Sequence, residues 1–317
     1  MSETHSTSKA LAMESTPLDR IICLLGRPPI RDFITLVKTR AIDGYRIDES
    51  DLTNEWRDAR SRLLDLESSE SNIADNAITE SLPDDMAQIA KAQLMRPEAQ
   101  TGFRLLPCAW RMVPIDSLVV MQQHINLRFI DQITAALSRS PTQNALIRLS
   151  VGTFHENAPV YLTQLSDSTF SVSSASSDFR FLKIAVLDPA ASCNFRVDGT
   201  PSTAIGVFLG YGVNFVTAVQ VGGRIILCNG MHRVFAMRSL GIEKIPCLVR
   251  YASSEDDLEV IQAADIQRNS QMMLHSARPP LFKDFFDPRL CKVISSQRTN
   301  RVFQVQVNVQ QWRTPAA

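Results

Sequence analysis

The sequence lacks an excess of charge of either sign, a long apolar run and any close pair of cysteines. Its 317 residues include 33 Lys and Arg against 33 Asp and Glu, so no overall basic field points to nucleic acid. No window of about 18 apolar residues occurs, which argues against a membrane-spanning helix. The 6 cysteines form no C-x-x-C pair, and such scattered thiols are more typical of a reducing compartment than of a disulfide framework.

The composition is that of an ordinary globular protein, with 44% apolar and 21% charged residues. This length is sufficient for one large domain or two. Residues 1–17 are polar and lack a basic start followed by an apolar core, so we expect a disordered lead rather than a secretory signal. Together with the cysteine pattern, this predicts a cytoplasmic protein.

Residues 18–105 are predicted to be helical. Apolar side chains between 52 and 66 recur at spacings of three and four, which marks one face of a helix: Leu52, Trp56, Ala59, Leu63 and Leu66. The stretch 65–85 is acidic and has no Lys or Arg, which is typical of a solvated connection. A second helix is expected to begin after Pro83.

From residue 106 onward the pattern becomes mixed. A short β-rich run at 112–120 precedes a helix at 126–137, and the Ser-rich stretch 166–178 predicts a loop or an exposed hairpin. Strands are predicted at 145–152, 158–165 and 179–188, whereas the glycines of 206–212 indicate a turn region.

The strongest local signal lies between residues 215 and 249. Two β runs, "FVTAVQV" and "RIILC", flank Gly222-Gly223, a two-residue connection typical of a hairpin. The segment "NGMHR" follows, then a helix at 232–240 that ends before Gly241, then the strand "KIPCLV". The sequence therefore predicts the order hairpin, polar loop, helix, strand.

The C-terminal part is predicted to contain a helix at 253–269, then a Pro-broken extension over 276–317 that ends in a half-buried strand. From Arg278 onward there are seven Lys and Arg against two Asp, a local excess of five positive charges. We expect this basic segment to contact nucleic acid if the protein binds any.

The loop at 229–233 is the candidate site. Asn229 and Gly230 precede the helix, where unpaired backbone N–H groups and the helix dipole favour a phosphate or carboxylate. Arg233 has the donor fork that clamps such an anion, and His232 can bond to it or exchange a proton. The alternative is structural: Arg233 pairs with an acidic side chain of a neighbouring helix, and His232 is a surface polar residue.

The unit "RIILCNGMHRVFAMRSLGIEKIPCLV" resembles the ParB/sulfiredoxin superfamily, whose members have a strand, a G-x-H-R or G-E-R-R loop, a helix, a Gly and a final strand. "VPIDSL" at 113–118 is similar to the opening strand of that domain, and "VIQAADIQRN" at 260–269 to its following helix. The resemblance implies an α+β chain in which the helical region 18–105 precedes a ParB/sulfiredoxin-like domain at 106–275. An insertion at about 150–212 interrupts that domain.

In that superfamily the loop binds nucleotide phosphates, and members include CTP-hydrolysing partition proteins, ATP-dependent reductases, free-serine kinases and nucleases. By resemblance, Asn229, Gly230, Met231, His232 and Arg233 would contact the phosphates of ATP or CTP with Mg²⁺. His232 and Arg233 would then serve in hydrolysis or phosphoryl transfer. Met231 stands where sulfiredoxins carry the reactive Cys, so sulfiredoxin chemistry is not expected. Asn229 stands where many members have an acidic residue, which weakens the inference of catalysis.

Two other functions stay open, a DNA-binding or nuclease-like protein and a non-catalytic interaction protein that has kept the fold. The metal ligand is not identified by the sequence, although Asp116, Asp131 and Glu156 each have the chemistry for Mg²⁺. A structural zinc site is not expected, because the chain lacks a second His or Cys at ligand spacing from His124, His155 or His275. Cys228 and Cys247 fall in apolar runs and are predicted to be inert.

Overall fold

The computed structural model describes residues 18–152, 158–176, 178–188, 202–261 and 264–313, so the predicted lead at 1–17 lies outside it. Helices and strands are mixed and the strands form several sheets, which confirms the α+β class in general terms. Within the described ranges, no helix is both long and apolar enough to cross a membrane.

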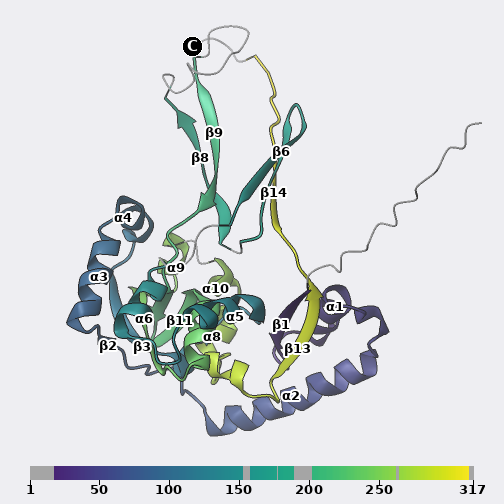
Figure 1. The fold of residues 1–317 in the computed structure, drawn as a ribbon. Coiled ribbons are helices and arrows are strands. Elements are labelled where there is room, and N and C mark those ends of the chain that lie inside the picture. The colour runs from purple at the N-terminus through teal and green to yellow at the C-terminus, as the bar shows by residue number, and fades with distance from the viewer. Residues whose placement is uncertain (1–17, 153–157, 177, 189–201, 262–263, 314–317) are drawn as a thin grey trace, which may run out of the picture.

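A six-stranded mixed sheet forms the centre of the body (Figure 1). Its strands, in spatial order, are β2 (Glu80–Ser81), β3 (Cys108–Pro114), β12 (Lys244–Tyr251), β10 (Thr217–Val221), β11 (Arg224–Asn229) and β4 (Val119–Val120). β10 pairs antiparallel with β11 and parallel with β12, and β12 pairs antiparallel with β3. The predicted hairpin, loop, helix and strand are all present, with the helix at α8 (Met231–Ser239).

Helices cover both faces of this sheet. The buried side chains of one face belong to a large cluster that includes residues of α3 (Asp84–Leu94), α4 (Pro97–Phe103), α5 (Leu127–Ala136), α6 (Gln143–Ser150) and α8. The other face packs against α9 (Asp257–Val260), α10 (Ala264–Arg268) and the following π-helical turn Gln271–His275. Since each fully buried Leu, Ile or Phe contributes about 1.5–3 kcal/mol, these clusters hold the loop at 229–233 on a well-packed support.

The N-terminal region differs from its prediction at its start. Residues Leu18–Leu24 form strand β1, the middle strand of a sheet with β13 (Cys291–Gln297) and β5 (His124–Asn126). α1 (Ile30–Arg40) and α2 (Glu49–Ser69) pack on it, and Leu52, Ala59 and Leu63 are buried as predicted. The run from Ile21 to Leu24 is buried throughout, which explains why a strand forms there.

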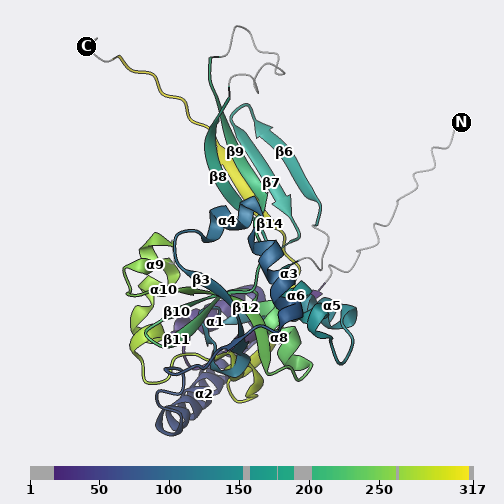
Figure 2. The ribbon, with the colours of Figure 1, turned by 90° about the vertical axis from the view of Figure 1, so that its left-hand side faces the viewer.

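The insertion at about 150–212 contributes most of two small sheets that project from the body (Figures 1 and 2). One contains β14 (Arg301–Gln306), β7 (Thr169–Ser174) and β6 (Val160–Ser166), and the other is a ribbon of β8 (Phe179–Leu187) and β9 (Ala204–Tyr211). We call these two sheets the arms. The predicted C-terminal strand is therefore present as β14, which pairs with β7 of the same chain.

Three local predictions are wrong. Residues 145–152 were predicted as a strand, but Gln143–Ser150 is helix α6, because Thr142 caps it by accepting from the Ala145 N–H. The expected turn at 206–212 lies mostly within strand β9. The expected continuous helix at 253–269 is present only as the short helices α9 and α10, and residues 262–263 between them are outside the described part.

Candidate functional site

The loop at 229–233 begins where β11 ends and turns sharply into α8. Gly230 has a φ of 102°, a left-handed conformation that side chains other than glycine rarely adopt. A Cβ atom added there would lie 2.9 Å from Cγ2 of Val216. The Val234 N–H donates to the Gly230 carbonyl at 2.9 Å and so closes the first turn of the helix. Glycine is required here for both conformation and space.

Arg233 is buried, and both of its terminal nitrogens donate hydrogen bonds within the protein. Nη1 donates to the carbonyl oxygens of Asn214 at 2.6 Å and Leu149 at 3.2 Å, and more weakly to that of Ser150 at 3.4 Å. Nη2 donates to Oδ1 of Asn214 at 2.8 Å. Burial lowers the pKa of the guanidinium to about 10, so it stays charged at neutral pH. The side chain joins the last turn of α6 to the start of β10.

This arrangement matches neither interpretation of Arg233 drawn from the sequence. Its hydrogen bonds go to carbonyl and amide oxygens, rather than to an anionic ligand or a carboxylate of a neighbouring helix. The carbonyls of Leu149 and Ser150 belong to the C-terminal turn of α6, where a cation is stabilised by the helix dipole. Arg233 thus acts as a cap for another helix and is not free to clamp a phosphate.

The side-chain amide of Asn229 also donates its hydrogen bonds within the protein. Its Nδ2 donates to Oδ1 of Asn214 at 3.0 Å and to the Phe215 carbonyl at 2.8 Å. Asn214 therefore accepts from both Asn229 and Arg233, and its own Nδ2 donates to the Asp178 carboxylate. Sequence reasoning missed Asn214 and Asp178. A polar residue immediately before a buried strand was the available signal for Asn214.

His232 is held in a neutral state. Its ring contacts the ring of Phe129 edge-on, with centroids 5.1 Å apart. Burial lowers the pKa of the imidazole to about 4, although the Asp178 carboxylate acts in the opposite direction. Nε2 is buried and has no hydrogen-bond partner among the described residues. The prediction that His232 exchanges a proton near neutral pH is not supported by this environment, and Met231, also predicted at the site, is buried in the core.

The carboxylates considered for Mg²⁺ are not gathered at this loop. Asp116 accepts from Nε of Arg238 at 2.8 Å, Asp131 pairs with Arg20 at 3.3 Å, and Glu156 lies outside the described residues. No group of three or more His, Cys, Asp or Glu suited to a metal is found in the ranges that the structure describes. Burial raises the pKa of the Cys228 and Cys247 thiols, which agrees with their expected inertness.

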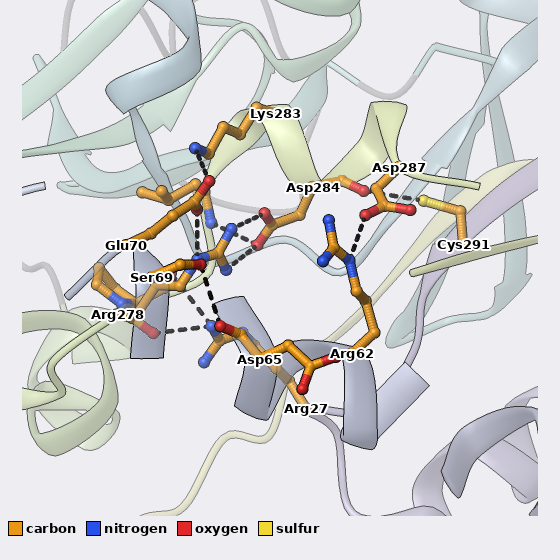
Figure 3. A network of polar contacts seen from close by, with 12 residues as sticks. Arg27, Arg62, Asp65, Ser69, Glu70, Arg278, Lys283, Asp284, Asp287 and Cys291 are labelled. Atoms are coloured by element: carbon orange, nitrogen blue, oxygen red, sulfur yellow. Dashed lines mark hydrogen bonds and ion pairs between the residues drawn. The ribbon is translucent and has the colours of Figure 1, made fainter. Parts of the chain in front are cut away.

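Acidic and basic segments that were expected to face solvent instead bind each other (Figure 3). Arg278 is 1% exposed and donates to Glu70 at 2.8 Å and to Asp284 at 2.6 and 3.1 Å. Lys283 also donates to Glu70, at 2.8 Å, and Nη2 of Arg27 donates to the Arg278 carbonyl at 2.8 Å. We call these five residues the charged cluster. It joins the end of α2 to the segment that precedes β13.

Further ion pairs form along the C-terminal segment. Lys292 pairs with Glu55 at 2.7 Å and Arg289 with Asp287 at 3.6 Å. Arg298 lies 3.4 Å from the buried carboxylate of Asp19. The prediction of a solvated acidic connection is corrected only in part: more than half of residues 65–85 are exposed, but 65–69 belong to α2, and Asp75 and Glu80 pair with Arg224 and Lys244. Much of the charge of the basic C-terminal segment is neutralised within the chain.

An open cavity of about 550 Å³ lies between α2 and β13, away from the loop, with Glu55, Asp58, Arg289 and Lys292 among its lining residues.

Comparison with known proteins found no matching family model, no matching curated protein and no matching solved structure. Function therefore has to be inferred from the site itself.

Proposed function

We propose that this chain is a binding protein that takes a phosphorylated ligand at the N-terminus of α8 and does not turn it over. The proposal keeps the nucleotide binding implied by the resemblance to the ParB/sulfiredoxin superfamily, with ATP or CTP as the first ligands to test. It drops the catalytic roles of His232 and Arg233. In this respect it joins the nucleotide-binding hypothesis to that of a non-catalytic protein that has kept the fold.

The feature that supports binding is the first turn of α8. Its leading backbone N–H groups have no intrahelical acceptor, and the positive end of the helix dipole lies there. Gly230 lets the chain turn tightly in front of them, and neither Gly230 nor His232 is fully buried. The buried Nε2 of His232 lacks a partner, and an unsatisfied polar atom of this kind is frequently explained by a ligand or water.

The absence of turnover is inferred from the two side chains that the resemblance would make catalytic. A general acid or base works best with a pKa near the working pH, and the pKa of His232 is about 4. Arg233 would have to give up bonds to Leu149 and Asn214 before it could neutralise a transferring phosphoryl group. Asp116 and Asp131 are already paired with arginines, so we assign no resident Mg²⁺ to them.

Nucleic-acid binding through the C-terminal segment is disfavoured, because basic side chains of this segment already have partners within the chain. Arg278, Lys283 and Lys292 all form ion pairs with carboxylates, and Arg301 donates to the Phe179 carbonyl. A phosphate backbone would have to compete with these partners. We therefore do not propose it as a second function.

Thermal unfolding with ATP, CTP or GTP, each with magnesium, tests the binding proposal. A ligand present at about a hundred times its dissociation constant adds roughly 2.7 kcal/mol to stability. The informative variants are His232→Gln, which removes the imidazole but keeps a polar side chain, and His275→Gln, the same change at a half-exposed histidine outside the loop. Arg233→Ala is unsuitable, since its loss would disturb the fold itself.

A stabilisation by one nucleotide that is reduced in His232→Gln but kept in His275→Gln is the expected result. Incubation of the same nucleotide with the wild-type protein should release no phosphate above background. Measurable turnover would contradict the non-catalytic part of the proposal. No stabilisation by any of the three nucleotides would contradict the binding part.

A further inference from the structure

The arms are almost free of charge. Within their five strands the charged residues are Arg180, Lys183 and Arg301. In contrast to the body, where charges are paired across distant segments, the arms expose large apolar side chains to solvent. Both views place the arms on the same side of the body, projecting away from the central sheet (Figures 1 and 2).

The β8–β9 ribbon is apolar on one face. Residues directly opposite each other in an antiparallel pair lie on the same face, and three such pairs fall along this one. They are Phe181 with Leu209, Ile184 with Val207, and Val186 with Ile205. The opposite face is mixed, because it contains Arg180, Lys183 and the glycines at 206 and 210 together with Phe208 and Leu187. One side of the ribbon is thus apolar and exposed among the described residues, and the other side is mixed.

Aromatic contacts bury the base of the ribbon, whereas the part farther from the body is exposed to solvent. Phe179 is buried, and its ring lies 5.5 Å from that of Phe303 and 5.7 Å from that of Tyr211. Towards the tip, Val186 is 74% exposed and Ile205 69% exposed. A two-stranded ribbon is marginally stable alone in water, so this exposed part requires a further surface to pack against.

Strand β6 is an edge strand. Among the described strands, the order β14-β7-β6 leaves one side of β6 without a neighbour, and all seven of its residues are exposed. Its sequence, VYLTQLS, contains no charge and no proline, two of the features with which proteins prevent edge pairing, although its register shifts between Gln164 and Ser166. Leu162 is 69% exposed on this edge.

We propose that a second copy of this chain covers the arms, with the two β6 strands pairing antiparallel across a two-fold axis. An antiparallel pair of identical edges satisfies the free backbone groups of both strands by symmetry. Since β6 carries no charge, bringing two copies together meets no like-charge repulsion along the edge. The pairing would extend each three-stranded sheet into a continuous six-stranded one.

The exposed area agrees with such a contact. Twelve large apolar side chains on the arm strands are 37–74% exposed: Val160, Tyr161, Leu162, Leu165, Phe181, Leu182, Ile184, Val186, Ile205, Val207, Phe208 and Val302. Together they expose on the order of 1,000 Å², but they lie on both faces of the strands. One partner would cover a part of this area, which is comparable at most with the about 800 Å² per partner of a standard stable interface. Monomeric proteins rarely expose so much apolar surface in one region.

Sedimentation velocity of the full chain between about 1 and about 100 µM tests this, because a dimer with micromolar affinity changes its mass across that range. Wild type is expected to sediment as a dimer at the upper end. Leu162→Lys places like charges close together near the two-fold axis and is expected to raise the dissociation constant at least about tenfold. Ile78→Lys is the matched control, since Ile78 is 78% exposed but lies outside the arms.

The control is expected to leave the dimer intact, and both variants should unfold at the same denaturant midpoint as the dissociated wild type. A wild-type protein that stays monomeric at every concentration would overturn the proposal. So would a dimer that Leu162→Lys does not weaken. Monomeric wild type that co-sediments with phospholipid vesicles would assign the arms to a lipid surface instead.

Discussion

The loop at 229–233 and the arms use their side chains in opposite ways. At the loop, polar groups that have the chemistry for a ligand are bonded inward, as Arg233 is to Asn214 and Leu149. In the arms, apolar groups that would normally form a core lie in solvent, as Val186 and Ile205 do. A residue type alone therefore does not locate the working surface. What matters is whether the side chain is already satisfied within its own chain.

The largest expected effect is at the charged cluster. Arg278→Ala removes one of the two basic partners of Glu70 and the ion-pair partner of the buried Asp284, and it is expected to cost about 3–5 kcal/mol of unfolding free energy. Urea unfolding measures it, with Arg289→Ala as the control. Arg289 pairs with Asp287 at the surface, so its loss should cost at most about 1 kcal/mol. Equal, small losses of unfolding free energy in the two variants would mean that water reaches the charged cluster.

Arg233→Ala is expected to be nearly as disruptive, costing about 3 kcal/mol, because it removes the donor of the buried Asn214 carbonyl and one donor each of Oδ1 of Asn214 and the Leu149 carbonyl. Arg238 lies on the same helix and pairs with the half-exposed Asp116. Arg238→Ala should therefore cost at most about 1 kcal/mol. If the two variants unfold alike in urea, Arg233 is free in solution and becomes available for an anion.

The pH dependence of stability should reveal His232. Its pKa is about 4 in the folded protein, below the usual value of 6.5, so the unfolded chain takes up the proton first as the pH falls. Stability is therefore unaffected above pH 6.5 and declines between pH 6.5 and about 4, by roughly 3 kcal/mol in total. His232→Gln should lose this part of the slope in unfolding curves taken across that range. An unchanged slope would show that His232 titrates normally.

The smallest effect is expected in the arms. Ile184→Thr, on the exposed face of the ribbon, should change the unfolding free energy of the monomer by no more than about 0.5 kcal/mol. The same substitution at the fully buried Ile225 in β11 should cost about 2 kcal/mol or more. Parallel denaturation curves compare the two. A large loss at Ile184 would place that side chain in a core rather than on a surface.

Elements with local signals could be predicted from the sequence. The turn at Gly222-Gly223, the helix end before Gly241 and the apolar face of α2 each depend on neighbouring residues, and all three are present. Strand β1 could not be recognised, because its partners β13 and β5 lie far away in the chain. Gly206 and Gly210, which predict a turn, lie within strand β9, because the pairing of β9 with β8 is not visible from the glycines alone.

The candidate site was predicted in its position and backbone but not in its side-chain environment. Gly230 does turn the chain into a helix. Nothing near Arg233 in sequence indicates that its acceptors are Leu149 at the end of α6 and Asn214 before β10. Likewise, the acidic and basic segments were each assigned to solvent, because Glu70 and Arg278 meet only through the tertiary fold.

The most direct test of this contrast is an NMR titration of the His232 ring, assigned by comparison with His232→Gln. If the loop is closed as described, the ring stays neutral from pH 8 to about 5.5, because its pKa is about 4. A midpoint between about 6 and 7 would contradict the account, since it would show a solvated imidazole able to take part in proton transfer.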